Sequence, residues 1–342
     1  MSKTFGRLPK GTRLERIQQS SNYKSGSFQN LSPTPALRED ASFCKMIKDF
    51  TNRPKSVRPA APFKIQHHDI AAVKAPSIVW FGHSSYLLKL EELTLIVDPV
   101  FSGHASPVKF FGKSFEGTDV FDVDQFGEID YVLITHDHYD HMDYETILKL
   151  KPKVKHFYTS LGVGSHLEYW GIPADKITEL DWWESAQIKD HVSITATPGR
   201  HFSGRGVKRA QTLWSSFVLK TSKENLFLGG DSGYDAHFKM IGEKYGPFDL
   251  ALLECGQYGE DWPNIHMTPE QTWQAAIDLN TKTLMPVHWG KFVLAMHPWK
   301  EPIERLFKAV NSDHLNIVTP MIGEPLSLHA TNTTTKWWTS ID

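Results

Sequence analysis

Three histidines and two aspartates occur within six consecutive positions of this 342-residue chain, directly after an apolar run. The run at 131–134 predicts a short buried strand, and the polar residues after it predict a loop at the mouth of that strand. His136 and His138 are two positions apart, so both imidazoles can point to the same side of the backbone. Asp140 and His141 follow one turn later and can face back toward them. The spacing predicts two pairs of ligands for two adjacent metal ions, and zinc, iron or manganese suits such ligands.

Three further ligand-type residues occur just beyond later strand-like segments. They are His201, Asp231 and His288. In layered α/β folds, functional sites gather at strand ends. The repeated context therefore predicts that five histidines and two aspartates converge on one point.

The rest of the pattern predicts the elements that position these groups. Three closely spaced segments predict an antiparallel opening meander at 77–81, 86–90 and 93–97. Further strands are expected at 155–159, 177–180, 192–197, 225–230, 248–254, 283–287 and 315–319. Helices are expected at 42–50, 144–151, 163–170 and 299–310. One more helix should begin at Thr268, where Pro269 and Gln271 match a capped start.

Polar residues at two other places in the meander are candidates for a role. Asp98 ends a predicted strand and can orient a ligand histidine through the free N–H of its ring. His83, Ser84 and Ser85 suggest a Ser/His nucleophile, but no Gly-x-Ser-x-Gly elbow surrounds them. We therefore expect this trio to have a structural or supporting role.

Composition limits the class of protein. The length allows one large domain or two, and 40% hydrophobic residues can build a sizeable core. No apolar window has the length needed to span a bilayer, and no secretory signal is expected at the N-terminus. Cys44 and Cys255 alone do not make a disulfide framework. We expect a cytoplasmic protein, with peripheral contact at the inner face of the membrane as an alternative.

Charge is unevenly distributed along the chain. Residues 1–75 contain 14 Lys and Arg against 5 Asp and Glu, whereas the whole chain has a net charge of −2. A basic segment can bind an anionic membrane surface or lie on the acidic body. We expect 1–75 to be an extension, partly irregular and either wrapping or flexible, and 76–342 to be the globular domain that holds the predicted metal ligands. The loop at 101–125 mixes Phe and Lys, which suits either a membrane interface or packing on the core.

The His-x-His-x-Asp-His motif and its context resemble the metallo-β-lactamase superfamily over roughly residues 76–320. This resemblance implies an α/β fold, a four-layer αβ/βα sandwich here preceded by the basic N-terminal extension, and a dinuclear metal site. One branch is more similar still: the N-acylphosphatidylethanolamine-hydrolysing phospholipases D and their bacterial relatives. The segments that carry this likeness are 80–83, 98–101, 180–184, 230–234, 245–250 and 288–290.

The resemblance also implies roles for individual residues. His136, His138 and His201 would bind one metal, Asp140, His141 and His288 would bind the other, and Asp231 would bridge both. His266 falls where the phospholipase has a histidine beside the substrate phosphate. We therefore expect Asp231, His266 and Asp140 to be catalytic. The resemblance also implies that His266 binds substrate. The other expected substrate-binding residues follow from their own chemistry: the Arg205 guanidinium suits phosphate, and Tyr258 and Trp182 could line an apolar pocket.

These expectations describe a hydrolase with two divalent metal ions, zinc first and manganese or iron as alternatives. A metal-bridging hydroxide would attack a phosphodiester, with His266 stabilising the phosphoryl charge or protonating the leaving oxygen. The alternatives are a lactonase or carboxylic ester hydrolase with the same site, a di-iron redox protein, and a non-catalytic binding protein. The expected partner is a small molecule or a phospholipid, not a nucleic acid. The oligomeric state stays open, with a homodimer as one option.

Overall fold

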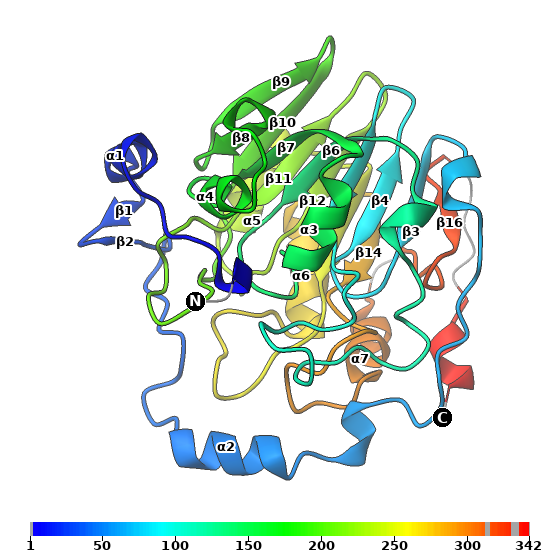
Figure 1. Ribbon diagram of the computed structural model, residues 1–342. Helices are drawn as coiled ribbons and strands as arrows, with labels where there is room; N and C mark the ends of the chain where they lie inside the picture. Colours follow the sequence, from blue (N-terminus) through cyan, green and yellow to red (C-terminus); the bar gives the residue numbers. More distant parts are fainter. Residues whose placement is uncertain (1–2, 312–314, 330–334, 342) are drawn as a thin grey trace.

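The computed structural model describes residues 3–311, 315–329 and 335–341 (Figure 1). Its body consists of two mixed seven-stranded sheets with flanking helices. The strand orders are β16-β3-β4-β5-β6-β7-β8 in the first sheet and β15-β14-β13-β12-β11-β10-β9 in the second. The predicted α/β sandwich is therefore confirmed.

The first sheet begins as the predicted antiparallel meander and continues with parallel strands. Its strands are β3 (Ser77–Trp80), β4 (Tyr86–Lys89), β5 (Thr94–Val97), β6 (Ile129–Ile134), β7 (Val154–Ser160), β8 (Ile177–Leu180) and β16 (Pro325–Ser327). Strands β5 and β6 pair in parallel, with Leu95 opposite Tyr131. Apolar residues follow one another without interruption in the second half of each of these strands, because both faces of the sheet are covered. The residues that follow β5 and β6 consequently emerge at the same edge.

The second sheet is antiparallel from β9 to β12 and parallel from β12 to β15. Its strands are β9 (Ser185–Lys189), β10 (Val192–Thr197), β11 (Ser216–Lys220), β12 (Asn225–Leu228), β13 (Leu250–Glu254), β14 (Thr283–Val287) and β15 (Asn316–Ile317). Because β12, β13 and β14 run in the same direction, Asp231, Glu254 and His288 all lie at their carboxyl ends.

The helices of the body include α6, which begins as predicted. The Thr268 side chain accepts a hydrogen bond from Gln271 N, and the Gln271 side chain accepts one from Thr268 N. This capping box satisfies backbone donors that the first turn leaves unpaired. The helices of the body are α3 (Tyr144–Leu150), α4 (Gly164–Tyr169), α5 (His237–Tyr245), α6 (Pro269–Asp278) and α7 (Glu301–Ala309).

The N-terminal segment contains more regular structure than the sequence suggested. It forms α1 (Thr12–Gln19), the short strands β1 (Tyr23–Lys24) and β2 (Ser27–Phe28), and α2 (Phe43–Thr51). The Ser42 side chain caps α2, at the helix start expected from the sequence. Arg13 pairs with Glu179 at 2.6 Å, and Arg16 pairs with Glu184 at 2.6 Å. The first part of the basic segment therefore lies on acidic residues of the body.

Two hydrophobic clusters hold the chain together. The larger fills the interior between the sheets and their helices. The smaller joins the N-terminal segment to the body and consists of Ile17, Phe28, Leu161, Trp182, Leu213 and Trp214. The loop at 101–125 packs on the core in one part, where Phe115 is buried against Phe63, whereas Phe110 is 81% exposed. Within the described residues, every helix is too short or too polar to cross a bilayer.

Candidate metal centre

A first set of ligand atoms gathers around His138. Its Nδ1 lies 2.9 Å from Nε2 of His136 and 3.2 Å from Nε2 of His201. Asp231 Oδ2 lies 3.8 Å from Nε2 of His136 and 3.7 Å from Nε2 of His201. His136 and His138 come from the loop after β6, His201 from the loop after β10, and Asp231 from the loop after β12. The two sheets thus contribute to one cluster.

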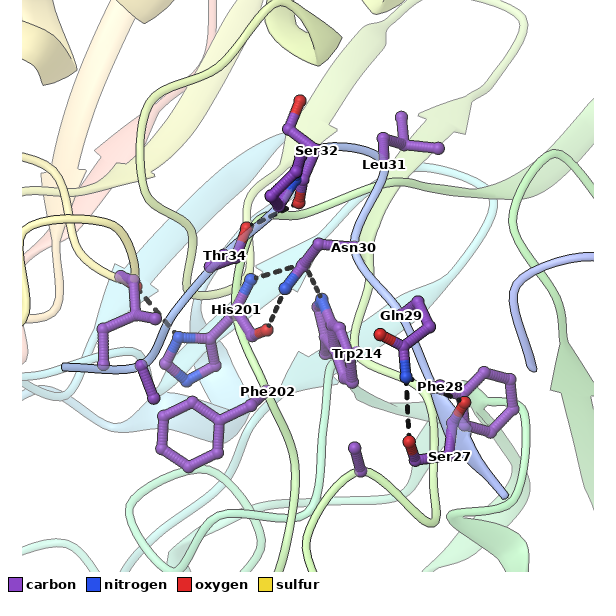
Figure 2. Close-up of a pocket in the computed structure, with 14 residues that line it drawn as sticks. Ser27, Phe28, Gln29, Asn30, Leu31, Ser32, Thr34, His201, Phe202 and Trp214 are labelled. Atoms are coloured by element: carbon purple, nitrogen blue, oxygen red, sulfur yellow. Dashed lines mark hydrogen bonds between the residues drawn. The ribbon is translucent and has the colours of Figure 1, made fainter. Parts of the chain in front are cut away.

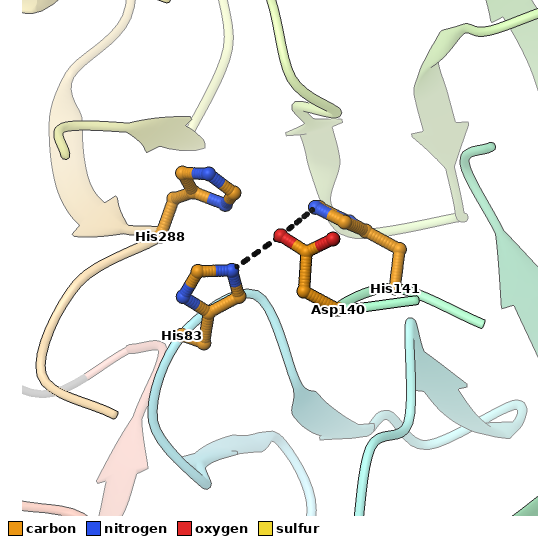
Figure 3. Close-up of side chains that lie close together, drawn as sticks. All are labelled: His83, Asp140, His141 and His288. Atoms are coloured by element: carbon orange, nitrogen blue, oxygen red, sulfur yellow. Dashed lines mark hydrogen bonds and ion pairs between the residues drawn. The ribbon is translucent and has the colours of Figure 1, made fainter. Parts of the chain in front are cut away.

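A second set lies on the other side of Asp231. Its Oδ1 is 3.1 Å from Nε2 of His141 and 3.1 Å from Nδ1 of His288. Asp140 Oδ2 is 3.5 Å from Nε2 of His141. Figure 3 shows Asp140, His141 and His288 around a common point, with His83 beside them. The two oxygens of Asp231 therefore face different sets of histidines.

The donor chemistry of both sets fits divalent cations. The ligand atoms of His136, His138, His201 and Asp231 lie within 4.8 Å of one another, and so do those of His83, Asp140, His141 and His288. This spacing is slightly wider than that of atoms bound about 2.0–2.2 Å from one zinc, so small side-chain shifts would let a cation bind each set. Among the described residues, His141 Nε2, Asp231 Oδ1 and His288 Nε2 are buried without a hydrogen-bond partner. Orphaned buried polar atoms are costly. Coordination of a cation would satisfy them.

The protonation states also suit metal binding. Burial, reinforced by neighbouring imidazoles, holds the pKa values of His136, His201 and His288 well below the ordinary value, so these rings are neutral. Burial opposes ionisation of Asp231, but the facing His141 outweighs it and holds the pKa of this carboxyl well below its usual range. Neutral imidazoles and an ionised carboxylate are the forms that ligate metals. His141 is the exception: burial opposes its charged form, but Asp231, Asp140 and Asp98 outweigh burial and hold the pKa of this ring well above its ordinary value. A metal would have to displace a proton from His141.

Asp98 supports the second set, as predicted. Nδ1 of His141 donates to Asp98 Oδ2 at 2.7 Å, so Nε2 is the ring nitrogen left for a metal. Thr135 donates to the same carboxylate through its backbone N–H and its hydroxyl, at 2.8 and 2.6 Å. These bonds fix Asp98 at the edge where β5 and β6 end.

His83 and Ser84 also support the cluster. His83 Nε2 lies 2.9 Å from Asp140 Oδ2, and Ser84 Oγ lies 2.9 Å from Nδ1 of His288. Ser85 donates to the backbone oxygen of Asp98 at 2.7 Å. The trio thus contacts residues of the cluster and Asp98, and His83 adds a nitrogen to the ligand atoms of the second set.

Asp137, inside the motif, has a role that the sequence did not reveal. Its Oδ2 lies 3.0 Å from Nε2 of His166, and its Oδ1 accepts from Gly204 N at 2.6 Å. Thr212 donates to the same carboxylate at 2.9 Å. Asp137 therefore ties the motif loop to the segment that follows His201.

Glu254 is the functional candidate that sequence reasoning missed most clearly. Nδ1 of His266 donates to Glu254 Oε2 at 2.6 Å, and Met267 N donates to Oε1 at 2.7 Å. Burial raises the pKa of Glu254 to about 7. Burial opposes the charged form of His266, but Glu254 outweighs it and raises the pKa of His266 to about 9. Because Glu254 ends β13, its place at a strand mouth could have identified it.

The structure brings His266 to the cluster. Its ring centroid lies 5.0 Å from that of His201 and 5.2 Å from that of His288, on which it stacks. Asp231, Glu254, His266 and His288 form a third group of converging ligand atoms. His266 therefore borders both metal sets.

The other three residues expected to bind substrate make contacts elsewhere. Arg205 is buried and donates to the backbone oxygens of Asp137 and Met142 at 2.8 and 2.7 Å. Tyr258 donates to Glu301 at 2.7 Å. Trp182 packs in the smaller hydrophobic cluster and donates to the backbone oxygen of residue 214 at 2.8 Å. The structure assigns packing and positioning contacts to these side chains.

A cavity of about 530 Å³ lies beside His201 (Figure 2). One wall comes from the N-terminal segment 27–36, and the other from residues near the metal ligands. The second wall includes His201, Phe202, Ala210, Trp214 and Ile265. The N-terminal segment thus borders a cavity next to a candidate metal ligand.

The sequence of this chain matches the model of a known protein family. The sequence model described as "Beta-lactamase superfamily domain" matches residues 94–289. That range contains all seven predicted metal ligands.

Curated relatives extend the similarity over most of the chain. An uncharacterized protein of Mycobacterium tuberculosis is 39% identical over 334 residues, which is 94% of this chain and 88% of the relative. The N-acyl-phosphatidylethanolamine-hydrolyzing phospholipase D 1 of Caenorhabditis elegans is 31% identical over 241 residues, 66% of this chain and 67% of the relative. The mitochondrial enzyme of that name in Saccharomyces cerevisiae is 33% identical over 247 residues, 66% of this chain and 50% of the relative.

Solved structures agree on the fold. A metallo hydrolase of Ignicoccus hospitalis superposes with a TM-score of 0.55 at 21% identity, over 73% of this chain and 97% of that one. An isothiocyanate hydrolase from Delia radicum gut bacteria gives 0.58 at 17% identity, over 73% and 98%. A diiron β-hydroxylase of Streptomyces venezuelae gives 0.54 at 19% identity, over 73% and 54%. At these identities the likeness shows the fold and not the reaction.

Proposed function

The chain belongs to the β-lactamase superfamily and is a metal-dependent hydrolase of that fold, and we propose that it cleaves phosphodiesters with two divalent cations, as an enzyme of the N-acylphosphatidylethanolamine phospholipase D type. The observation that carries this proposal is the position of Asp231. Its two oxygens face separate sets of histidines, at 3.7–3.8 Å on one side and 3.1 Å on the other. A carboxylate in this position suits a bridge between two cations.

The seven predicted ligands would hold the cations. His136, His138 and His201 form one set, Asp140, His141 and His288 form the other, and Asp231 is shared. Two bound cations would lower the pKa of water and polarise a phosphoryl or carbonyl oxygen. Zinc is the first candidate because imidazole and carboxylate are ligands that it favours, and manganese or iron are the alternatives.

The residues around the cluster would orient the substrate and move protons. Glu254 accepts from Nδ1 of His266, so Nε2 is the nitrogen of His266 that is free to meet a substrate. The His266 side chain keeps 12% exposure, whereas Glu254 is buried. His266 can thus donate from Nε2 to a phosphoryl oxygen or to the leaving oxygen. Glu254 would hold the ring in place and stabilise its charge.

An exposed patch supports a lipid substrate and peripheral contact with a membrane. In α2, Ile47 is 50% exposed, and Phe50 stacks on Phe111 with ring centroids 5.8 Å apart. Phe110 and Val108 are exposed in the loop that bears Phe111. Basic residues occur in or just after the same two segments: Lys45, Lys48, Arg53, Lys109 and Lys113. Two of them form ion pairs, Lys45 with Asp49 and Lys109 with Glu145. Aromatic and basic side chains together favour the interface of an anionic bilayer.

A substrate panel tests the proposed reaction. The chain is stripped with a chelator, reloaded separately with zinc, manganese or iron, and offered a simple phosphodiester, an N-acyl phospholipid and a lactone. We expect hydrolysis of the phosphodiesters to return with metal. Turnover of the lactone alone would favour the carboxylic ester hydrolase instead, and oxygen consumption by the iron form would favour a redox protein. No turnover with two cations bound would indicate a binding protein.

A further inference from the structure

The Asn30 side chain forms hydrogen bonds with both the backbone N–H and the backbone C=O of His201. Its Oδ1 accepts from His201 N at 3.0 Å, and its Nδ2 donates to His201 O at 2.8 Å. Oδ1 also accepts from Trp214 Nε1 at 3.1 Å. Figure 2 shows these three bonds converging on Asn30 from the loop of His201 and from Trp214. One amide therefore connects the N-terminal segment to a candidate metal ligand.

The Asn30 side chain binds His201 in a loop, beyond the end of strand β10. His201 lies four residues beyond the end of β10, so no strand partner fixes its N–H and C=O groups. Backbone groups that are buried need a partner, and Asn30 supplies one for each. The His201 ring is held separately, because its Nδ1 donates to Ile265 O at 2.9 Å. Backbone and ring bonds together set the position of Nε2, which faces His138 at 3.2 Å.

The segment that carries Asn30 is itself anchored at both ends. On one side, Phe28 is buried in the smaller hydrophobic cluster and its N–H donates to Ala210 O at 2.9 Å. On the other side, Arg200 donates to Thr34 Oγ1 at 3.0 Å and to Pro33 O at 3.1 Å. Since Arg200 directly precedes His201, the segment grips the same loop twice. Because the segment is held on both sides of Asn30, the position of the Asn30 side chain is fixed relative to the loop of His201.

We propose that Asn30 is a positioning residue for His201, so that this one side chain of the N-terminal segment belongs to the metal centre. The inference rests on the proposed function, in which His201 binds one of two cations. The amide fixes a ligand that the fold otherwise leaves on a loop. Loss of groups that orient a metal ligand typically weakens metal binding 10- to 100-fold.

Cobalt(II) titration of the full chain tests the inference. The visible absorbance of bound cobalt reports its coordination, and competition with a chelator gives the affinity of each ion. We expect Asn30→Ala to bind the ion of the His136, His138 and His201 set about tenfold or more weakly. Asn30→Asp keeps the acceptor for His201 N and Trp214 and loses the donor to His201 O. We expect a smaller loss in that variant.

The matched control is Gln29→Ala. Gln29 is exposed, and the bonds of its side-chain amide go to Ser27 in its own segment. We expect this variant to bind both cobalt ions as the wild type does. Cobalt affinity and spectrum of Asn30→Ala equal to those of Gln29→Ala would overturn the inference. If Asn30→Ala does not fold, by circular dichroism, the Asp variant decides: weaker cobalt binding than in Gln29→Ala supports the inference, and equal binding overturns it.

The number of cobalt ions that the wild type binds shows whether a negative result concerns this inference or the proposed function. If the wild type does not bind two cobalt ions, the proposed function fails and the inference fails with it. If the wild type binds two ions and the Asn30 variants bind them equally well, only the positioning role is wrong.

Discussion

Nδ1 of His141 donates to Asp98 Oδ2 at 2.7 Å, although the two residues lie 43 positions apart in the chain. The parallel pairing of β5 and β6 produces this contact, because both strands end at the same edge. The bond holds His141 in the tautomer whose Nε2 faces Asp231. The first sheet therefore supplies both a metal ligand and the group that orients it.

Replacement of Asp98 should weaken binding in the second set. In Asp98→Asn, an amide N–H would replace an acceptor that now receives His141 Nδ1–H and the Thr135 hydroxyl. We expect the affinity for one zinc ion to fall about 10- to 100-fold, with the other ion less affected. Isothermal titration of the metal-free protein measures both steps. Equal affinities in Asp98→Asn and wild type would show that the contact does not tune the site.

Glu254 should affect turnover more than metal content. In Glu254→Gln, the partner of His266 Nδ1 is neutral, so the charged ring loses its stabilisation. We expect kcat to fall by about 10²-fold, while both cations stay bound. The comparison is Glu270→Gln, which changes an exposed carboxylate paired with Arg305 and should leave kcat unchanged. A Glu254→Gln enzyme with normal kcat would remove His266 and its partner from the mechanism.

His237 should make stability depend on pH. Burial is the main cause that lowers its pKa to about 4, compared with an ordinary value of about 6.5. Between pH 6.5 and 4 the unfolded chain takes up a proton that the folded chain does not, so stability falls as the pH falls through this window. Between these two pH values, the titration of His237 lowers the free energy of unfolding by about 3 kcal/mol. Above pH 6.5 this stability is fully present.

Urea unfolding at pH 7 and pH 4.5 measures this effect. His237→Gln has no titrating group at that position, so its free energy of unfolding should fall less between the two pH values than that of the wild type. Each protein is compared with itself, which cancels the acid sensitivity of the other histidines. Parallel losses in the two proteins would assign the acid sensitivity to other groups.

Contact with a membrane should depend on the exposed aromatic patch. We expect the chain to sediment with vesicles that contain anionic phospholipid, and Phe110→Asp to reduce the bound fraction severalfold. Val207→Asp places the same charge at another exposed apolar position and serves as the control. Equal losses in both variants, or no vesicle binding by the wild type, would argue against peripheral contact.

His138→Ala should reduce hydrolysis to the background rate while the fold stays largely intact. His138 contacts both other histidines of its set, so its loss removes the centre of one metal set. Circular dichroism checks the fold, and the assay checks turnover. The exposed His68 provides the control variant His68→Ala, which should keep full activity. Unchanged turnover in His138→Ala would rule out the proposed mechanism.

Much of the site could be predicted from sequence because its residues follow strands. The segments at 131–134, 225–228 and 283–287 are apolar enough to predict buried strands. Ligand-type residues directly after them must then emerge at sheet edges. The same logic would have found Glu254, which closes β13, but a single glutamate after an apolar run resembles an ordinary strand end. Its meaning appears only when His266 is placed beside it.

Other parts depend on contacts that no local pattern reveals. Asn30 and His201 are 171 positions apart, and nothing near Asn30 indicates a partner. The surroundings of Arg205 are hidden in the same way: a guanidinium suits phosphate, and this chemistry is the reason to expect that it binds substrate. In the structure its guanidinium is buried on Tyr139 and satisfied by backbone oxygens. The elements expected from the sequence do not include the strands β9 and β11 or the helix α5, although the structure contains all three. In β9 the sequence Ser-Ala-Gln-Ile-Lys is too polar to predict a buried strand.

The central claim is that Asp231 joins two cation sites, and the number of zinc ions per chain tests it most directly. Native mass spectrometry would compare the wild type with Asp231→Asn, both folded and reloaded under the same conditions. We predict two zinc ions in the wild type and fewer than two in the variant, which also loses hydrolysis. A wild-type chain with one zinc or none, or an Asp231→Asn chain that retains two, would contradict the account.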